Sequence, residues 1–129
     1  MKEITLPYHL IIPSIISICI LAVIFINGRK LFNKNENKLF WISLTVFLSI
    51  YLFIVAGGTY ADISSQLALR KFDLNGNGMF NGAEITPELK VALKKASSDT
   101  GRNFSFITGL IFSGVIASFV FIIGKKMNQ

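Results

Sequence analysis

Three long apolar blocks constrain this chain more than any other feature of its sequence. They span residues 8–26, 39–56 and 104–124, and none of them contains Asp, Glu, Lys or Arg. An α-helix rises about 1.5 Å per residue, so each block has the length needed to cross a hydrocarbon core roughly 30 Å thick. The sequence therefore predicts an all-α membrane protein with three transmembrane helices.

The overall composition agrees with this prediction. Of the 129 residues, 52% are hydrophobic, and the mean hydropathy of +0.58 exceeds the values of soluble proteins. The first block is longer than the apolar part of a signal peptide, and it carries no cleavage signal of small residues. We therefore expect it to stay as a permanent anchor, with residues 1–56 holding the first two helices and residues 104–129 the third helix and a basic tail.

The positions of the basic residues predict the orientation. The loop 27–38 and the C-terminal tail lie on one side of a three-span topology, and the cytoplasmic side accumulates Lys and Arg. Their basic residues are Arg29, Lys30, Lys34, Lys38, Lys125 and Lys126, against a single Glu36. The other border carries Lys2 and Arg102, and the remaining basic residues lie farther from the lipid. We expect a cell membrane of the bacterial type, with the N-terminus and segment 57–103 outside and the C-terminus cytoplasmic.

The net charge of +6 would suggest nucleic acid as the partner of a soluble protein, but the placement of the basic residues favours anionic lipid here. The basic residues cluster at membrane borders and do not alternate with aromatic residues as they do on a nucleic-acid surface. The sequence contains no nucleophile placed beside a base, no phosphate-binding loop and no metal-hydrolase cluster, so we expect no enzymatic activity. The single Cys19 rules out a disulfide within the chain.

The segment 57–103 between the second and third blocks is polar and predicts two short helices. "AGGTY" (56–60) and "SSDTGRN" (97–103) are typical of flexible exits from membrane helices. The helical patterns cover about residues 61–72 and 86–96. The second pattern begins with Thr86 and Pro87, which is the usual order of an N-cap followed by a proline in the first helical position.

Between these two helices lies "DLNGNGMFNGAE" (73–84), which has the residues of a calcium loop. Calcium takes about six to eight oxygen ligands, and a twelve-residue loop supplies them from its first, third, fifth, seventh, ninth and twelfth positions. The run matches D-x-[DN]-x-[DN]-G-x₅-E in full and resembles the EF-hand family. The resemblance implies an EF-hand-like helix-loop-helix inserted between the second and third membrane helices, with a positive φ angle at Gly78. The implied metal ligands are Asp73, Asn75, Asn77, Met79 through its carbonyl, Asn81 and Glu84.

The details of the loop imply weak binding and an unusual pairing. Only Asp73 and Glu84 are ionised ligands, which suggests a dissociation constant of about 10⁻⁴ to 10⁻³ M, suited to an outward-facing loop. Pro87 predicts that the exiting helix breaks after Glu84 and restarts at Thr86. EF-hands usually occur in pairs, so Phe80 is expected to pair between two protomers or to dock on the membrane helices. The alternative is a Gly/Asn-rich connector that binds no metal.

Small residues on the third block predict close helix packing. Four of them recur at four-residue spacing: Ser105, Gly109, Ser113 and Ala117. Such a stripe lets two helix backbones approach each other, either within one protomer or between protomers. Self-association through this stripe is therefore one expected route to a homo-oligomer.

Together these features favour a small membrane protein that binds calcium and acts as a sensor or as a regulatory or assembly subunit. The alternative is a calcium-gated channel or pore-forming homo-oligomer, lined by hydroxyl groups of Ser43, Thr45, Ser49 or Ser113. A weaker alternative is a holin-like pore, because the chain resembles three-span phage holins in size, topology and basic tail. The membrane blocks contain no Asp, Glu, Lys or Arg, and their one histidine, His9, is near a border, which disfavours proton-coupled transport.

Overall fold

The computed structural model describes residues 6–33, 37–98 and 100–129 and is helical, with no strand in these ranges. Three of its helices are long and apolar enough to cross a membrane. These helices are α1 (Tyr8–Ile26), α3 (Lys38–Arg70) and α6 (Ser105–Met127). The predicted all-α class with three helices of membrane-spanning length and composition is therefore confirmed.

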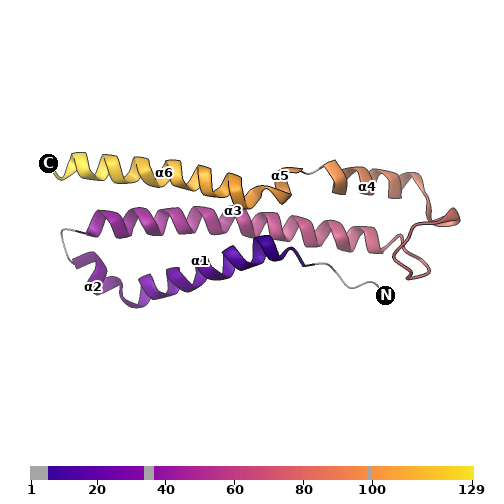
Figure 1. The fold of residues 1–129 in the computed structure, drawn as a ribbon, viewed down its shortest axis with the longest axis horizontal. Helices are drawn as coiled ribbons and strands as arrows, with labels where there is room; N and C mark the ends of the chain where they lie inside the picture. The colour runs from indigo at the N-terminus through magenta and orange to yellow at the C-terminus, as the bar shows by residue number, and fades with distance from the viewer. Residues whose placement is uncertain (1–5, 34–36, 99) are drawn as a thin grey trace.

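Helix α3 is the centre of the molecule. The helices α1 and α6 run antiparallel to it along its two sides, and the short α2 (Gly28–Asn33) leads from α1 towards α3 (Figure 1). The core that joins them consists of Leu10, Tyr51 and Val55, with Phe106 packed against it. All three long helices therefore meet near the middle of α3.

The outer faces of the long helices are apolar and exposed. Large side chains on these faces include Ile15, Ile18, Phe53, Ile111, Phe112 and Phe119. Soluble monomers rarely expose contiguous apolar surface on this scale, whereas lipid chains cover such surface at no cost. This exposure fits the membrane assignment of the three helices. Of the charges used to predict orientation, Lys2, Lys34 and Glu36 lie outside the described residues.

The predicted flexible exit at 56–60 is wrong. Helix α3 continues without a break through Gly57 and Gly58 to Arg70, so the predicted short helix 61–72 is its outer end. The reason is packing: a Cβ atom on Gly58 would lie 3.1 Å from the Cβ atom of Ser105 and would meet its hydroxyl more closely still. Glycine at position 58 therefore serves the close approach of α6 and not flexibility.

The second half of the polar segment is also more helical than predicted. Helix α4 covers Pro87–Ser98 and is followed by the single turn α5 (Thr100–Asn103), so most of the predicted exit 97–103 is helical. The predicted restart is confirmed, because α4 begins at Pro87 and Thr86 Oγ1 accepts a hydrogen bond from the backbone N–H of Leu89 at 3.2 Å. Leu89 is fully buried and fixes α4 against the rest of the molecule.

Candidate functional site

The loop 73–84 lies at the end of the molecule remote from the α1–α2–α3 connection (Figure 1). It follows the end of α3 and closes with the 3₁₀ turn η1 (Gly82–Glu84) before α4. Gly78 has a φ angle of 73°, as the sequence predicts, and Gly76 has a φ angle of 70°. Side chains with a Cβ atom disfavour this left-handed region, so the glycines allow the tight winding of the loop.

Three of the predicted ligand side chains turn back onto the loop backbone. Asp73 Oδ2 accepts a hydrogen bond from Gly78 N at 2.8 Å. Asn75 Oδ1 accepts one from Asn77 N at 3.0 Å, and Asn77 Oδ1 accepts one from Met79 N at 2.7 Å. Such side-chain turns fix the winding of short loops without regular secondary structure. They hold the oxygens of Asp73, Asn75 and Asn77 against one continuous stretch of backbone.

Glu84 closes the loop. Its side chain is buried, and its Oε1 accepts hydrogen bonds from Leu74 N at 2.9 Å and Asn75 N at 3.1 Å. Its Oε2 accepts a third from Asn81 N at 3.2 Å. A carboxylate has about four lone-pair sites, so three N–H groups leave it with capacity for a further donor or a cation. Glu84 therefore ties the start of the loop to its end.

Asp73 has an oxygen that the loop leaves unsatisfied. Its Oδ1 is buried and has no hydrogen-bond partner in the described parts of the chain. A buried polar oxygen without a donor costs free energy, which a cation or water would recover. The other candidate ligands of the loop are carboxylate, amide and carbonyl oxygens, the hard ligands that calcium prefers. By the chemical type of their oxygens, these residues are ones that could hold a calcium ion.

The same loop has few charged ligands. Within the described ranges, no group of three or more His, Cys, Asp or Glu side chains could hold a metal ion. The loop itself holds only two acidic residues, Asp73 and Glu84. A metal here would depend on amide and backbone oxygens for the rest of its shell. Asn81 and Met79 are exposed, and Phe80 is partly buried within its own chain. Pairing of Phe80 between two loops stays a prediction.

A second polar cluster, centred on Arg102, lies between the loop and the membrane helices. Arg102 Nε lies 3.2 Å from Asp62 Oδ1 of α3, and the two side chains are only 8% and 13% exposed. Arg102 Nη1 donates to Ser65 Oγ and Nη2 donates to the Ala96 carbonyl, each at 3.0 Å. This Arg102 cluster therefore joins α3, the end of α4 and α5.

The sequence analysis missed this cluster. From the sequence, Arg102 is assigned only as a charge near the membrane border, whereas its side chain is buried and pairs with Asp62 of α3. One signal was available: Asp62 is the first acid after the second apolar block, and Arg102 is the last basic residue before the third. A three-span topology brings these two positions to the same border, where opposite charges pair.

The stripe of small residues packs within the protomer. Ser105, Gly109, Ser113 and Ala117 are all buried. A Cβ atom on Gly109 would lie 3.2 Å from Tyr51 Cδ2 and 3.3 Å from Ile54 Cγ2, both on α3. Of the two packings open to this stripe, the one against α3 of the same chain is therefore present. Self-association through the same residues stays a prediction and would require α3 to be displaced.

The hydroxyl groups considered for a pore do not share one surface of the protomer. Ser43 and Ser113 are buried, whereas Ser49 is exposed. Three of the four donate to their own helix: Thr45 to the Trp41 carbonyl, Ser49 to the Thr45 carbonyl and Ser113 to the Gly109 carbonyl. A single protomer therefore offers no common lining from these four residues, and the pore stays a prediction about an oligomer.

Comparisons with protein-family models, with curated proteins and with solved structures find no match to this chain. The likeness of the loop to an EF-hand therefore depends on its own residues and geometry.

Proposed function

We propose that this chain is an integral membrane protein that binds Ca²⁺ in the loop 73–84 and acts as a calcium-responsive regulatory or assembly subunit. The observation that carries the proposal is the buried Asp73 Oδ1, for which the described residues provide no hydrogen bond. The other candidate metal ligands of the loop are also hard oxygens. A divalent cation would satisfy this oxygen and would offset the charges of Asp73 and Glu84.

Six residues would hold the ion. Asp73 and Glu84 would supply carboxylate oxygens, Asn75, Asn77 and Asn81 amide oxygens, and Met79 its backbone carbonyl. Because four of the six ligands are neutral, the expected dissociation constant is about 10⁻⁴ to 10⁻³ M, the range of extracellular calcium modules. This range favours a loop on the outer side of the membrane, in line with the basic residues expected on the cytoplasmic side.

The Arg102 cluster offers a route from the loop to the membrane. Helix α3 is continuous up to Arg70 and offers a fixed support, whereas α4 is a separate helix that follows the loop directly and is held by the buried Leu89 and by Arg102. The Ala96 carbonyl near the end of α4 accepts from Arg102, whose own carbonyl accepts from Ser105 at the start of α6. A calcium ion that moves α4 would therefore shift the start of α6, provided that it binds the two arrangements with different affinity.

Calorimetric titration of the full chain in detergent micelles tests calcium binding. The informative variant is Glu84→Gln, which keeps an acceptor oxygen for Leu74 N and Asn75 N but removes a charge. The matched control is Glu88→Gln, which removes an equal charge from an exposed position of α4. We expect wild type and Glu88→Gln to bind one ion at about 10⁻⁴ to 10⁻³ M, and Glu84→Gln to bind at least about tenfold more weakly. Equal binding by all three, or none below about 10 mM, contradicts the proposal.

A further inference from the structure

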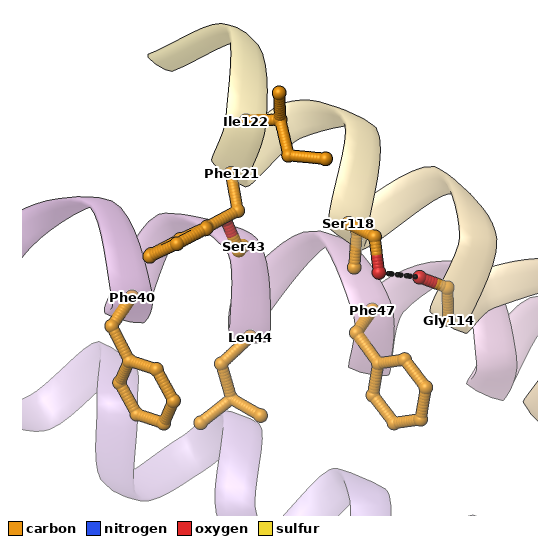
Figure 2. A pocket seen from close by; sticks show the side chains of 9 residues that line it. Phe40, Ser43, Leu44, Phe47, Gly114, Ser118, Phe121 and Ile122 are labelled. Atoms are coloured by element: carbon orange, nitrogen blue, oxygen red, sulfur yellow. Dashed lines mark hydrogen bonds between the residues drawn. The ribbon is translucent and has the colours of Figure 1, made fainter. Parts of the chain in front are cut away.

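A groove of about 540 Å³ lies between α3 and α6, away from the calcium loop. Its lining is mostly apolar and aromatic and comes from both helices (Figure 2). The main contributors are Phe40, Leu44 and Phe47 of α3 and Gly114, Phe121 and Ile122 of α6. The volume is within the range of about 300 to 1,000 Å³ that is usual for ligand sites. The groove opens on the part of the helices that is apolar enough to face lipid.

One hydroxyl group in this lining is unsatisfied. Ser43 is 7% exposed, and its buried Oγ has no hydrogen-bond partner among the residues that the structure describes. Its neighbours behave differently, because Thr45 Oγ1 donates to the Trp41 carbonyl and Ser118 Oγ donates to the Gly114 carbonyl (Figure 2). Because a buried hydroxyl without a partner costs free energy, an occupant with an acceptor oxygen at this depth would be stabilised.

Beyond the end of the groove formed by Phe40 and Phe121, both helices carry lysines. The side chain of Leu39 lies against Gly124, which brings the next residues outward on the two helices, Lys38 and Lys125, to the same end. Lys38, Lys125 and Lys126 are all exposed. Ser43 is five residues from Lys38, which is about 7 Å along a helix. From this end inward, the site therefore presents cations, then a hydroxyl donor, then apolar surface.

We propose that this groove binds an anionic phospholipid. The order of its groups matches that of the lipid: the headgroup phosphate would contact the lysines, a glycerol ester carbonyl would accept from Ser43, and an acyl chain would lie against Phe47 and Gly114. Basic pockets between membrane helices recognise anionic headgroups through the same charge complementarity. A second copy of the chain would fill the apolar part but would leave the lysines and Ser43 without partners. The site does not depend on calcium.

Native mass spectrometry of the full chain, incubated with equal amounts of phosphatidylglycerol and phosphatidylcholine that carry identical acyl chains, tests the headgroup. We expect wild type to retain one phosphatidylglycerol molecule in preference to phosphatidylcholine. In Lys125→Gln/Lys126→Gln this preference should fall roughly ten- to thirtyfold, since each lysine near a membrane surface contributes several-fold to the binding of anionic lipid. The control Lys90→Gln/Lys94→Gln removes the same charge from exposed positions of α4 and should keep the preference.

A second pair of variants tests the groove itself. A Cβ atom on Gly114 would lie 3.9 Å from Phe47 Cε2, an ordinary contact, so Gly114→Ala should keep the bound lipid. Gly114→Leu extends into the groove and favours the helix, so it should lose both lipids while circular dichroism stays unchanged. The proposal is wrong if Gly114→Leu retains lipid as wild type does, or if both double-lysine variants lose the preference equally. It is also wrong if wild type is a lipid-free dimer that Gly114→Leu converts to a monomer.

Discussion

The inner and outer halves of α3 are held by different interactions. In the apolar half, residues 39–56, the packing side chains are Tyr51 and Val55, and hydroxyl groups such as those of Thr45 and Ser49 donate to carbonyls of their own helix. In the outer half, Asp62 and Ser65 bond to Arg102 of another element. Hydrogen bonds within the helix occur in both halves, since Ser65 also donates to the Ala61 carbonyl, but the contacts to Arg102 join the outer half to another element.

The two halves of α3 therefore have different proposed roles: the inner half stabilises the helix packing, and the outer half connects the loop to α6. Lipid gives helices no hydrophobic reason to associate, so the inner half depends on close packing of small residues such as Gly109. In the outer half, the buried ion pair of Arg102 with Asp62 joins α5 to α3, and removal of one partner would leave a buried charge uncompensated. Under the proposed function, a change at the loop 73–84 would reach α6 through the outer half.

The largest expected effect comes from breaking the outer half at its ion pair. Arg102→Met leaves the largely buried Asp62 carboxylate without its cation and should lower the free energy of unfolding by about 3 kcal/mol. Denaturant titration in micelles measures this loss. The exposed Arg29→Met at the other end of the molecule should change stability by less than about 0.5 kcal/mol. Equal losses for the two variants would show that the Arg102 pair has no special role.

A smaller effect is expected where the two halves of α3 meet. Gly58→Ala places a methyl group against Ser105 and should cost about 1 to 3 kcal/mol. At the adjacent Gly57, no described atom lies within 4 Å of the added Cβ, so Gly57→Ala should stabilise the helix by about 0.5 to 1 kcal/mol. Thermal unfolding should show a lower midpoint temperature for Gly58→Ala and a higher one for Gly57→Ala. Destabilisation by Gly57→Ala would mean that residues 56–60 are not helical.

The smallest of the three effects concerns the start of α4. Thr86→Ala removes the hydroxyl that accepts from Leu89 N and should cost about 1 kcal/mol. The loss should appear as faster amide hydrogen exchange in the first turns of α4, with the exchange of α6 unchanged. Ser97→Ala removes an exposed hydroxyl near the other end of α4 and serves as the control. If both variants exchange alike, Thr86 does not act as an N-cap.

The fold was predictable where one strong pattern decides the structure. The apolar blocks were sufficient to predict the three spanning helices, and Thr86 with Pro87 predicted the start of α4. The break expected at residues 56–60 was wrong because glycine signals both flexibility and close packing, and only the position of Ser105 distinguishes the two. Local sequence cannot supply that position, because it depends on how α6 lies against α3.

The candidate sites were predictable to different degrees. The loop 73–84 follows a motif of fixed spacing, so the positive φ angle at Gly78 could be predicted from it, whereas its metal ligands stay a prediction. The hydrogen bonds that Glu84 accepts from Leu74 N and Asn75 N could not be predicted, because the motif assigns that side chain to the metal. The Arg102 cluster and the groove around Ser43 each combine residues far apart in the chain. Such combinations require the helix packing to be known.

In the proposed function, calcium at the loop acts on α4 and on the start of α6. Hydrogen exchange followed by mass spectrometry, with and without about 5 mM Ca²⁺, tests it most directly, because this concentration exceeds the expected dissociation constant. We predict that calcium slows exchange in residues 73–105 of wild type, that exchange in the inner half of α3 stays unchanged, and that Glu84→Gln shows no calcium effect. Equal exchange in wild type with and without calcium, or the same slowing in Glu84→Gln, would contradict the account.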